Sequence, residues 1–202
     1  MKKILISILR DRTTSIEGFR TAADQLSNVM AIESAAILTK TTTSLETPMA
    51  PTHGVRFKPS IMLVPILRSG LVMLPAFLRY HPTAHVGFIG AHRDEVTALP
   101  KLDYSNLPQI TKDHHILVLD PMIATGGSAS MASKILKKAG AIESQITMVS
   151  FIAASEGLMH FQEKFPDINV IVAQVDDKLD KNKFIVPGLG DFGDRFFGTE
   201  SE

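Results

Sequence analysis

The 202-residue sequence has no cysteine, no tryptophan and no excess charge of either sign. Without cysteine, disulfide bonds, cysteine-ligated zinc and thiol chemistry are excluded. Lys+Arg and Asp+Glu number 21 each, so the formal net charge is +0. A neutral chain offers no polybasic surface for nucleic acid or an anionic membrane. We therefore expect neither of these as a partner.

Long uninterrupted apolar runs are also missing. The longest, residues 61–78, is interrupted by two prolines, a glycine and Arg68, whereas a membrane helix needs about 20 predominantly apolar residues. The apolar segment 4–9 is too short for a signal peptide and is followed by charged residues. These absences predict a cytoplasmic protein.

The composition that remains is that of an ordinary globular protein, 45% hydrophobic and 21% charged. A chain of this size can bury about 70% of its surface, which is enough for one domain over residues 1–202. After about residue 60, short apolar segments alternate with helical patterns. This alternation predicts an α/β fold with a mainly parallel sheet flanked by helices, together with an N-terminal helix and a small β-hairpin excursion.

Local patterns place the expected elements. Thr14 and Glu17 form a T-x-x-E capping box before apolar residues at helical spacing, which predicts a long helix. Residues 39–58 are expected to form an extended loop or a loose hairpin. The remaining expectations are, in chain order, strand 61–67, helix 71–78, strands 86–90 and 116–119, helix 128–139, strand 146–153, helix 156–165 and strand 168–175.

The segment Ile116–Ser128, ILVLDPMIATGGS, carries the strongest functional signal. An apolar strand leads into a single acid, Asp120, and then into a glycine-rich loop at the start of a helix. Free N–H groups at a helix start, together with the hydroxyls of Thr125 and Ser128, can form a cradle for an anion. The alternative is a loop with an ordinary Ser/Thr helix cap.

Three other kinds of ligand site are not supported by the sequence: a P-loop, a dinucleotide site and a histidine metal site. The loop lacks the lysine of a P-loop. Gly188–Gly193 matches G-x-G-x-x-G, but only nine residues follow it, too few for the βαβ unit of a dinucleotide site. The histidine pairs His81/His85 and His114/His115 have no H-E-x-x-H context, so a structural or solvent-exposed role is favoured over a metal site.

Two arginines, Arg68 and Arg93, each follow an expected strand. Ligands of such sheets bind beyond the carboxyl ends of the strands, and guanidinium groups suit bidentate contact with phosphate. The alternatives are an ion pair with Asp94 or Glu95, or a solvated surface charge. Together with the Thr-Gly-Gly-Ser loop, the two arginines indicate a crevice for a ligand with more than one phosphate.

These motifs together resemble a known family. VLDPMIATGGS (118–128) resembles the phosphoribosyl-diphosphate (PRPP) motif of type I phosphoribosyltransferases. With VPILRSG (64–70) and IVPGLGDFGDRFFGT (185–199), the chain is similar to uracil phosphoribosyltransferases from Leu9 almost to its end. The resemblance implies the type I fold and the conversion of uracil and PRPP to UMP and pyrophosphate. It also implies Mg²⁺ as cofactor, held through PRPP and not directly by protein ligands.

The resemblance implies roles for individual residues. The catalytic residues would be Asp120, Asp191, Arg68 and Arg93. Uracil would be bound, largely through backbone groups, by Ile185, Gly190, Asp191 and Phe192. PRPP would be bound by Arg68, Arg93, Asp120, Pro121, Met122, Ile123, Ala124, Thr125, Gly126, Gly127, Ser128 and Asp191.

The segment Pro100–Pro108 resembles a family hairpin, but Asp103 and Asn106 stand where a tyrosine and a lysine are usual. Two alternatives therefore stay open: a non-catalytic regulatory protein that binds PRPP or UMP, and a transferase for another base. The resemblance further implies a homodimer or a larger homo-oligomer. GTP is a candidate effector because it activates some relatives, although the sequence reveals no second nucleotide site.

Overall fold

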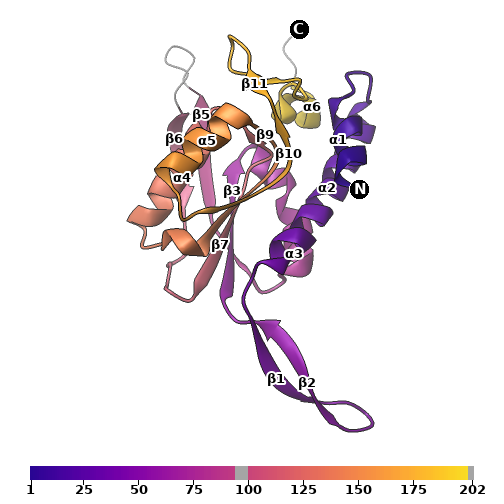
Figure 1. Cartoon of the computed structure of the whole chain (residues 1–202), viewed down its shortest axis with the longest axis vertical. Coiled ribbons are helices and arrows are strands. Elements are labelled where there is room, and N and C mark those ends of the chain that lie inside the picture. Colours follow the sequence, from indigo (N-terminus) through magenta and orange to yellow (C-terminus); the bar gives the residue numbers. More distant parts are fainter. Residues whose placement is uncertain (94–99, 200–202) are drawn as a thin grey trace.

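The computed structural model describes residues 1–93 and 100–199, without the side chain of Arg93. Two helices, α1 (Lys2–Arg10) and α2 (Ile16–Ala36), begin the chain. The hairpin of β1 (Lys40–Glu46) and β2 (Pro51–Phe57) follows and extends away from the body of the molecule (Figure 1). The expected hairpin excursion is confirmed.

An eight-stranded sheet forms the centre, in the order β10-β9-β7-β3-β5-β6, with β4 paired to β3 and β8 paired to β9. All of these pairs are parallel except β5 with β6. The expected mainly parallel sheet is therefore confirmed. Its strands are β3 (Ser60–Leu67), β4 (His85–Val86), β5 (Phe88–Arg93), β6 (Pro100–Asn106), β7 (His114–Leu119), β8 (Met122–Ile123), β9 (Ile146–Ala154) and β10 (Asn169–Asp176).

Helices cover both faces of this sheet. Alternate residues of its buried strands point to opposite sides, so both faces are apolar and each packs against helices. Leu63, Leu117 and Val149 pack in one core with α1, α2 and α3 (Leu74–Tyr80). Met62, Ile116 and Met148 pack in a second core with α4 (Gly127–Lys138) and α5 (Ser155–Lys164). The remaining elements are η1 (Ser69–Val72), η2 (Glu143–Gln145), β11 (Lys178–Leu179), β12 (Ile185–Val186) and α6 (Phe192–Phe197).

The N-terminal expectations need correction. Helix α2 begins one residue later than the capping box predicted, because the side chain of Ser15, and not that of Thr14, accepts the hydrogen bond from the Gly18 N–H at 3.1 Å. The segment 4–9, noted only as apolar, lies in the separate helix α1. Leu5, Ile6 and Leu9 of α1 are buried, so the segment contributes one face of an amphipathic helix to the core.

The order of the strands locates the ligand crevice. Chain connections from β3 lead first to β5 on one side and later to β7 on the other, so the direction of strand addition reverses at β3. In open parallel sheets, ligands bind beyond the carboxyl ends of the strands at such a switch point. Arg68 follows β3 and Asp120 follows β7 at this point. None of the helices in the described ranges is long and apolar enough to cross a membrane.

Candidate functional site

Three adjoining cavities lie beyond the carboxyl ends of the strands. Their volumes are about 130, 500 and 210 Å³. Ser128 lines all three cavities, and Asp120 and Asp191 line both of the larger ones. The arrangement forms one elongated site with three compartments, which we name the loop, central and C-terminal cavities in that order.

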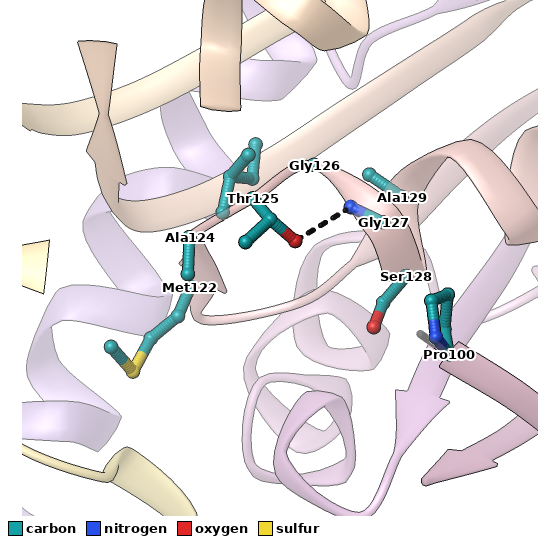
Figure 2. A pocket seen from close by; sticks show the side chains of 9 residues that line it. Pro100, Met122, Ala124, Thr125, Gly126, Gly127, Ser128 and Ala129 are labelled. Carbon is teal, nitrogen blue, oxygen red and sulfur yellow. Dashed lines mark hydrogen bonds between the residues drawn. The ribbon is translucent and has the colours of Figure 1, made fainter. Parts of the chain in front are cut away.

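The loop cavity is bounded by residues 122–129 and by Pro100 (Figure 2). Helix α4 begins after Gly126, whose φ of 74° lies in the left-handed region that glycine adopts without strain. The N-cap residue is this glycine, which has no side chain to cap the helix. Thr125 Oγ1 accepts one hydrogen bond, from the Gly127 N–H at 3.3 Å. The N-cap position is thus held by glycine and not by Ser or Thr, Thr125 bonds one N–H at the start of the helix, and the helix N-terminus faces a cavity of about 130 Å³.

Asp120 lies where β7 ends, between the central and C-terminal cavities. Its backbone N–H donates to the Val149 carbonyl at 3.2 Å, which fixes the residue to the neighbouring strand. Burial raises the pKa of the Asp120 carboxyl to about 7. A hydrogen bond with the Met122 backbone lowers the pKa, but by less than burial raises it. A carboxylate whose solvation is incomplete in this way is a candidate functional group.

Arg68 follows β3, and its peptide bond with Leu67 is cis. Its side chain is 66% exposed in the central cavity, with Nη2 at 3.6 Å from Asp194 Oδ1. The turn after it requires Gly70, because a Cβ there would lie 2.2 Å from the Leu119 carbonyl oxygen. Arg93 ends β5, at the same edge of the sheet. Its side chain and its alternative partners Asp94 and Glu95 lie outside the described residues.

The C-terminal cavity is formed by the segment after β11 and by the start of α6. It contains all four residues expected to bind uracil, Ile185, Gly190, Asp191 and Phe192, and also Lys183 and Phe184. The Phe192 ring is buried and packs on Phe19 and Phe151 at centroid distances of 5.3 and 5.6 Å. The ring therefore anchors the start of α6 in the core.

A partly buried ion pair that no sequence motif marks positions this segment. Asp176 pairs with Arg10 of α1, and its Oδ2 accepts from the Gly188 N–H at 2.8 Å. The Asp176 side chain is only 3% exposed. The acid at the end of β10 thus joins the N-terminal helix to the glycine-rich segment of the C-terminal cavity. Asp176 and Asp177 are adjacent acids, and nothing in the local sequence indicates which of the two is buried.

Asp194 and Arg195 are neighbours in α6 but face different parts of the molecule. The Asp194 carboxylate lies near Arg68. Arg195 donates to the carbonyls of Leu9, Asp11 and Leu189 and lies over the Phe19 ring, 4.4 Å from its centroid. It thereby joins α6 to the N-terminal helices.

A second contact that sequence reasoning missed lies in the central cavity. His92 Nδ1 is 2.7 Å from Asp103 Oδ1, and both residues line the cavity with Arg68 and Asp120. Asp103 was noted only as a departure from the family hairpin. Among the histidine pairs, His114 contacts His85 at 3.3 Å between ring nitrogens, so the closest pair joins two strands and not neighbours in sequence.

The donor set of the site suits a phosphorylated ligand that brings its own cation. The carboxylates of Asp103, Asp120 and Asp191 share the central cavity and are hard oxygen donors of the kind that Mg²⁺ prefers. Within residues 1–93 and 100–199, however, no three His, Asp or Glu residues are grouped to hold a metal ion by themselves. A magnesium ion carried by phosphate oxygens, with few protein ligands, fits these residues.

Comparison with known sequences gives matches over nearly the whole chain. A family model described as uracil phosphoribosyltransferase matches residues 1–199. The chain is 42% identical over 194 residues to a protein named uracil phosphoribosyltransferase from Salinibacter ruber, covering 96% of this chain and 91% of that one.

Solved structures agree with the architecture. AQ2163 from Aquifex aeolicus superimposes with a TM-score of 0.91 at 32% identity, covering 100% of this chain and 96% of that one. A purine phosphoribosyltransferase from Pyrococcus horikoshii has a TM-score of 0.51 at 13% identity, over 77% of this chain and 83% of that one, and shares the fold alone. The expected type I phosphoribosyltransferase fold is confirmed.

Proposed function

Because this chain belongs to the uracil phosphoribosyltransferase family, we propose that it transfers the phosphoribosyl group of PRPP to uracil, giving UMP and pyrophosphate. It is accordingly a pentosyltransferase. The observation that carries the proposal is the division of one site into three compartments that share Ser128. PRPP and uracil together present three parts: a 5′-phosphate, a ribose with its diphosphate, and a base.

Each part of the ligand has a compartment of matching chemistry. The 5′-phosphate binds in the loop cavity, where the backbone N–H groups of the first turn of α4 lie. The ribose and diphosphate occupy the central cavity, between Asp120 and Arg68. Uracil enters the C-terminal cavity, where backbone groups near Gly190 read its polar edge. The whole PRPP-binding segment is residues 120–128, assisted by Arg68, Arg93 and Asp191.

The reaction builds positive charge on the ribose ring and negative charge on the leaving diphosphate. The Asp120 carboxylate can accept hydrogen bonds from the ribose hydroxyls and stabilise the cationic ring. Arg68 and Arg93 hold the diphosphate and stabilise the charge that it gains as it leaves. Asp191, which lines both the central and the C-terminal cavities, would accept the N1 proton that uracil loses.

Mg²⁺ would be held chiefly through PRPP, and the Asp120 and Asp191 side chains, which line the central cavity, would face it there. When bound, it would supply Lewis-acid neutralisation of the leaving group.

Residues 1–202 act as one phosphoribosyltransferase domain in the cytoplasm, as a homodimer or larger homo-oligomer. GTP is included as a candidate effector only by the family resemblance.

A steady-state assay tests the function. With uracil, PRPP and Mg²⁺, the protein is expected to release UMP and pyrophosphate in equal amounts, and to turn over other pyrimidines and purines much more slowly. Tight PRPP binding without turnover would instead favour the regulatory alternative. Faster turnover of another base would assign the chain to a transferase for that base.

A further inference from the structure

The contact between His92 and Asp103 has no place in the site described so far. His92 Nδ1 lies 2.7 Å from one carboxylate oxygen of Asp103 and 2.8 Å from the other. The two side chains are 55% and 50% exposed, so solvent or a ligand can reach both. Both line the cavity of about 500 Å³ that also contains Arg68, Asp120 and Asp191.

An irregularity of the sheet brings the two residues together. The antiparallel register of β5 and β6 shifts between Gly90 and Ala91, which pair with Tyr104 and Leu102 respectively. Asp103 is thus an extra residue without a partner on β5. Such a bulge changes the direction of a side chain and is frequent beside active sites. Here it places the Asp103 carboxylate against the imidazole of His92.

We propose that His92 binds the diphosphate group of PRPP through Nε2, and that Asp103 is a positioning residue that holds the ring by Nδ1. This inference rests on the proposed function, because it assigns the diphosphate to the central cavity. A histidine bound at one ring nitrogen by a carboxylate has a fixed orientation, with its other nitrogen available to a ligand.

The charges around His92 explain why a further donor is useful there. Three aspartates line the central cavity: Asp103, Asp120 and Asp191. Among the described residues, Arg68 is the cation that lines the cavity together with His92. Lys101 lies opposite His92 on β6. A diphosphate entering this cavity meets the carboxylates of Asp120 and Asp191, and a hydrogen bond donated by His92 Nε2 beside Arg68 would offset part of their repulsion.

The test measures binding of inorganic pyrophosphate with Mg²⁺ by isothermal titration calorimetry, with UMP as the control ligand. For His92→Asn, we expect pyrophosphate affinity to fall about tenfold, the loss of one hydrogen bond to a charged group. UMP affinity should not change, because UMP lacks the diphosphate. KM for PRPP should rise, with little change in KM for uracil.

Two further variants separate positioning from general damage. Asp103→Asn should weaken pyrophosphate binding less than His92→Asn, and the double variant should be no weaker than His92→Asn alone, because both changes remove one interaction. Leu102→Ala is the control. It changes the neighbour of Asp103 on β6 at a residue outside the cavity lining, and should leave pyrophosphate affinity unchanged.

Several results would overturn the inference. Pyrophosphate affinity within about twofold of wild type in His92→Asn would remove His92 from the diphosphate site. An equal loss of UMP affinity would show that the ring only shapes the site, and additive effects in the double variant would reject Asp103 as its positioning residue. If wild type binds pyrophosphate and His92→Asn does not, the inference stands even when no UMP is formed. In that case the proposed function is what fails.

Discussion

The carboxylate of Asp191 accepts a hydrogen bond from the backbone N–H of Asp194 at 2.9 Å and so caps helix α6. The same residue lines the central and C-terminal cavities. One side chain therefore has two separable duties, holding the helix and presenting a negative charge to the ligand. Asparagine caps helices as well as aspartate does, so a single substitution can remove the charge and keep the cap.

Asp191→Asn is accordingly expected to lower kcat about 100-fold, the low end for loss of an acid–base or electrostatic group, while the melting temperature stays near that of wild type. Asp194→Asn is the matched comparison. Its carboxylate lies 3.6 Å from Arg68 and accepts from the Thr199 hydroxyl at 2.7 Å, so it should act mainly by loosening α6 and Arg68, with a smaller loss of kcat. If Asp194→Asn loses more kcat than Asp191→Asn, the proton acceptor has been assigned to the wrong residue.

Gly126 and Gly127, the two glycines that line the loop cavity, should respond differently to substitution. A Cβ at Gly127 would meet Pro100 side-chain atoms at 3.2 Å, and the residue has no left-handed φ. Gly127→Val should therefore keep the fold but block the approach to phosphate, lowering PRPP affinity about tenfold or more. Calorimetric titration with PRPP and a thermal melt measure both effects. Unchanged affinity would exclude this loop from the site.

Gly126 supplies the contrast. Its φ is 74°, and a Cβ would lie 2.6 Å from the Gly157 carbonyl oxygen. Gly126→Ala should therefore destabilise the fold by roughly 1–2 kcal/mol or more, because both the backbone conformation and a contact with α5 oppose it. Chemical denaturation measures this loss.

Arg68→Ala should reduce catalysis more than product binding. Its guanidinium is proposed to hold the diphosphate, which UMP lacks, and its ion pair with Asp194 is largely exposed and contributes little to stability. We expect kcat/KM for PRPP to fall by a factor corresponding to about 2–4 kcal/mol, with UMP affinity nearly unchanged. Equal losses in the two affinities would mean that Arg68 has a structural role or is misassigned.

Some features were readable from the sequence because they depend on local chemistry. The strand before Asp120 and the glycine-rich helix start after it follow from hydrophobic pattern and backbone freedom. Other features depend on packing between distant segments. Asp176 meets Arg10 across most of the chain, and Asp103 reaches His92 through a bulge that no local motif marks. Asp194 and Arg195 are adjacent in sequence, yet Arg195 faces the N-terminal helices and Asp194 faces Arg68.

The raised pKa of Asp120 predicts opposite effects of one substitution on stability and activity. Its folded-state pKa of about 7 exceeds the ordinary 3.8, so between these values the folded protein binds more protons than the unfolded chain. The stability due to this group is therefore fully present below about pH 4 and is lost as the pH rises to about 7. Asp120→Asn should remove that loss. It should stabilise the ligand-free protein by about 2 kcal/mol near pH 8 and by little near pH 4, allowing for the partial exposure of the side chain.

The same substitution should lower kcat strongly, because the ionised carboxylate is the form proposed to stabilise the ribose cation. In wild type, kcat/KM should rise with pH through about 7 as Asp120 ionises. Calorimetric melts at the two pH values and a pH–rate profile measure these effects. A variant that is destabilised near pH 8, or a wild-type profile flat from about pH 6 to 8, would contradict the assignment.

A crystal structure of the protein with UMP tests the central claim most directly, since it asks which compartment holds which part of the ligand. We expect the phosphate to accept hydrogen bonds from the backbone N–H groups that follow Thr125, with the ribose hydroxyls on Asp120 and the base beside Gly190. A phosphate bound elsewhere, such as in the cavity of about 310 Å³ lined by Arg12 and Arg195, with the loop cavity empty, would contradict it.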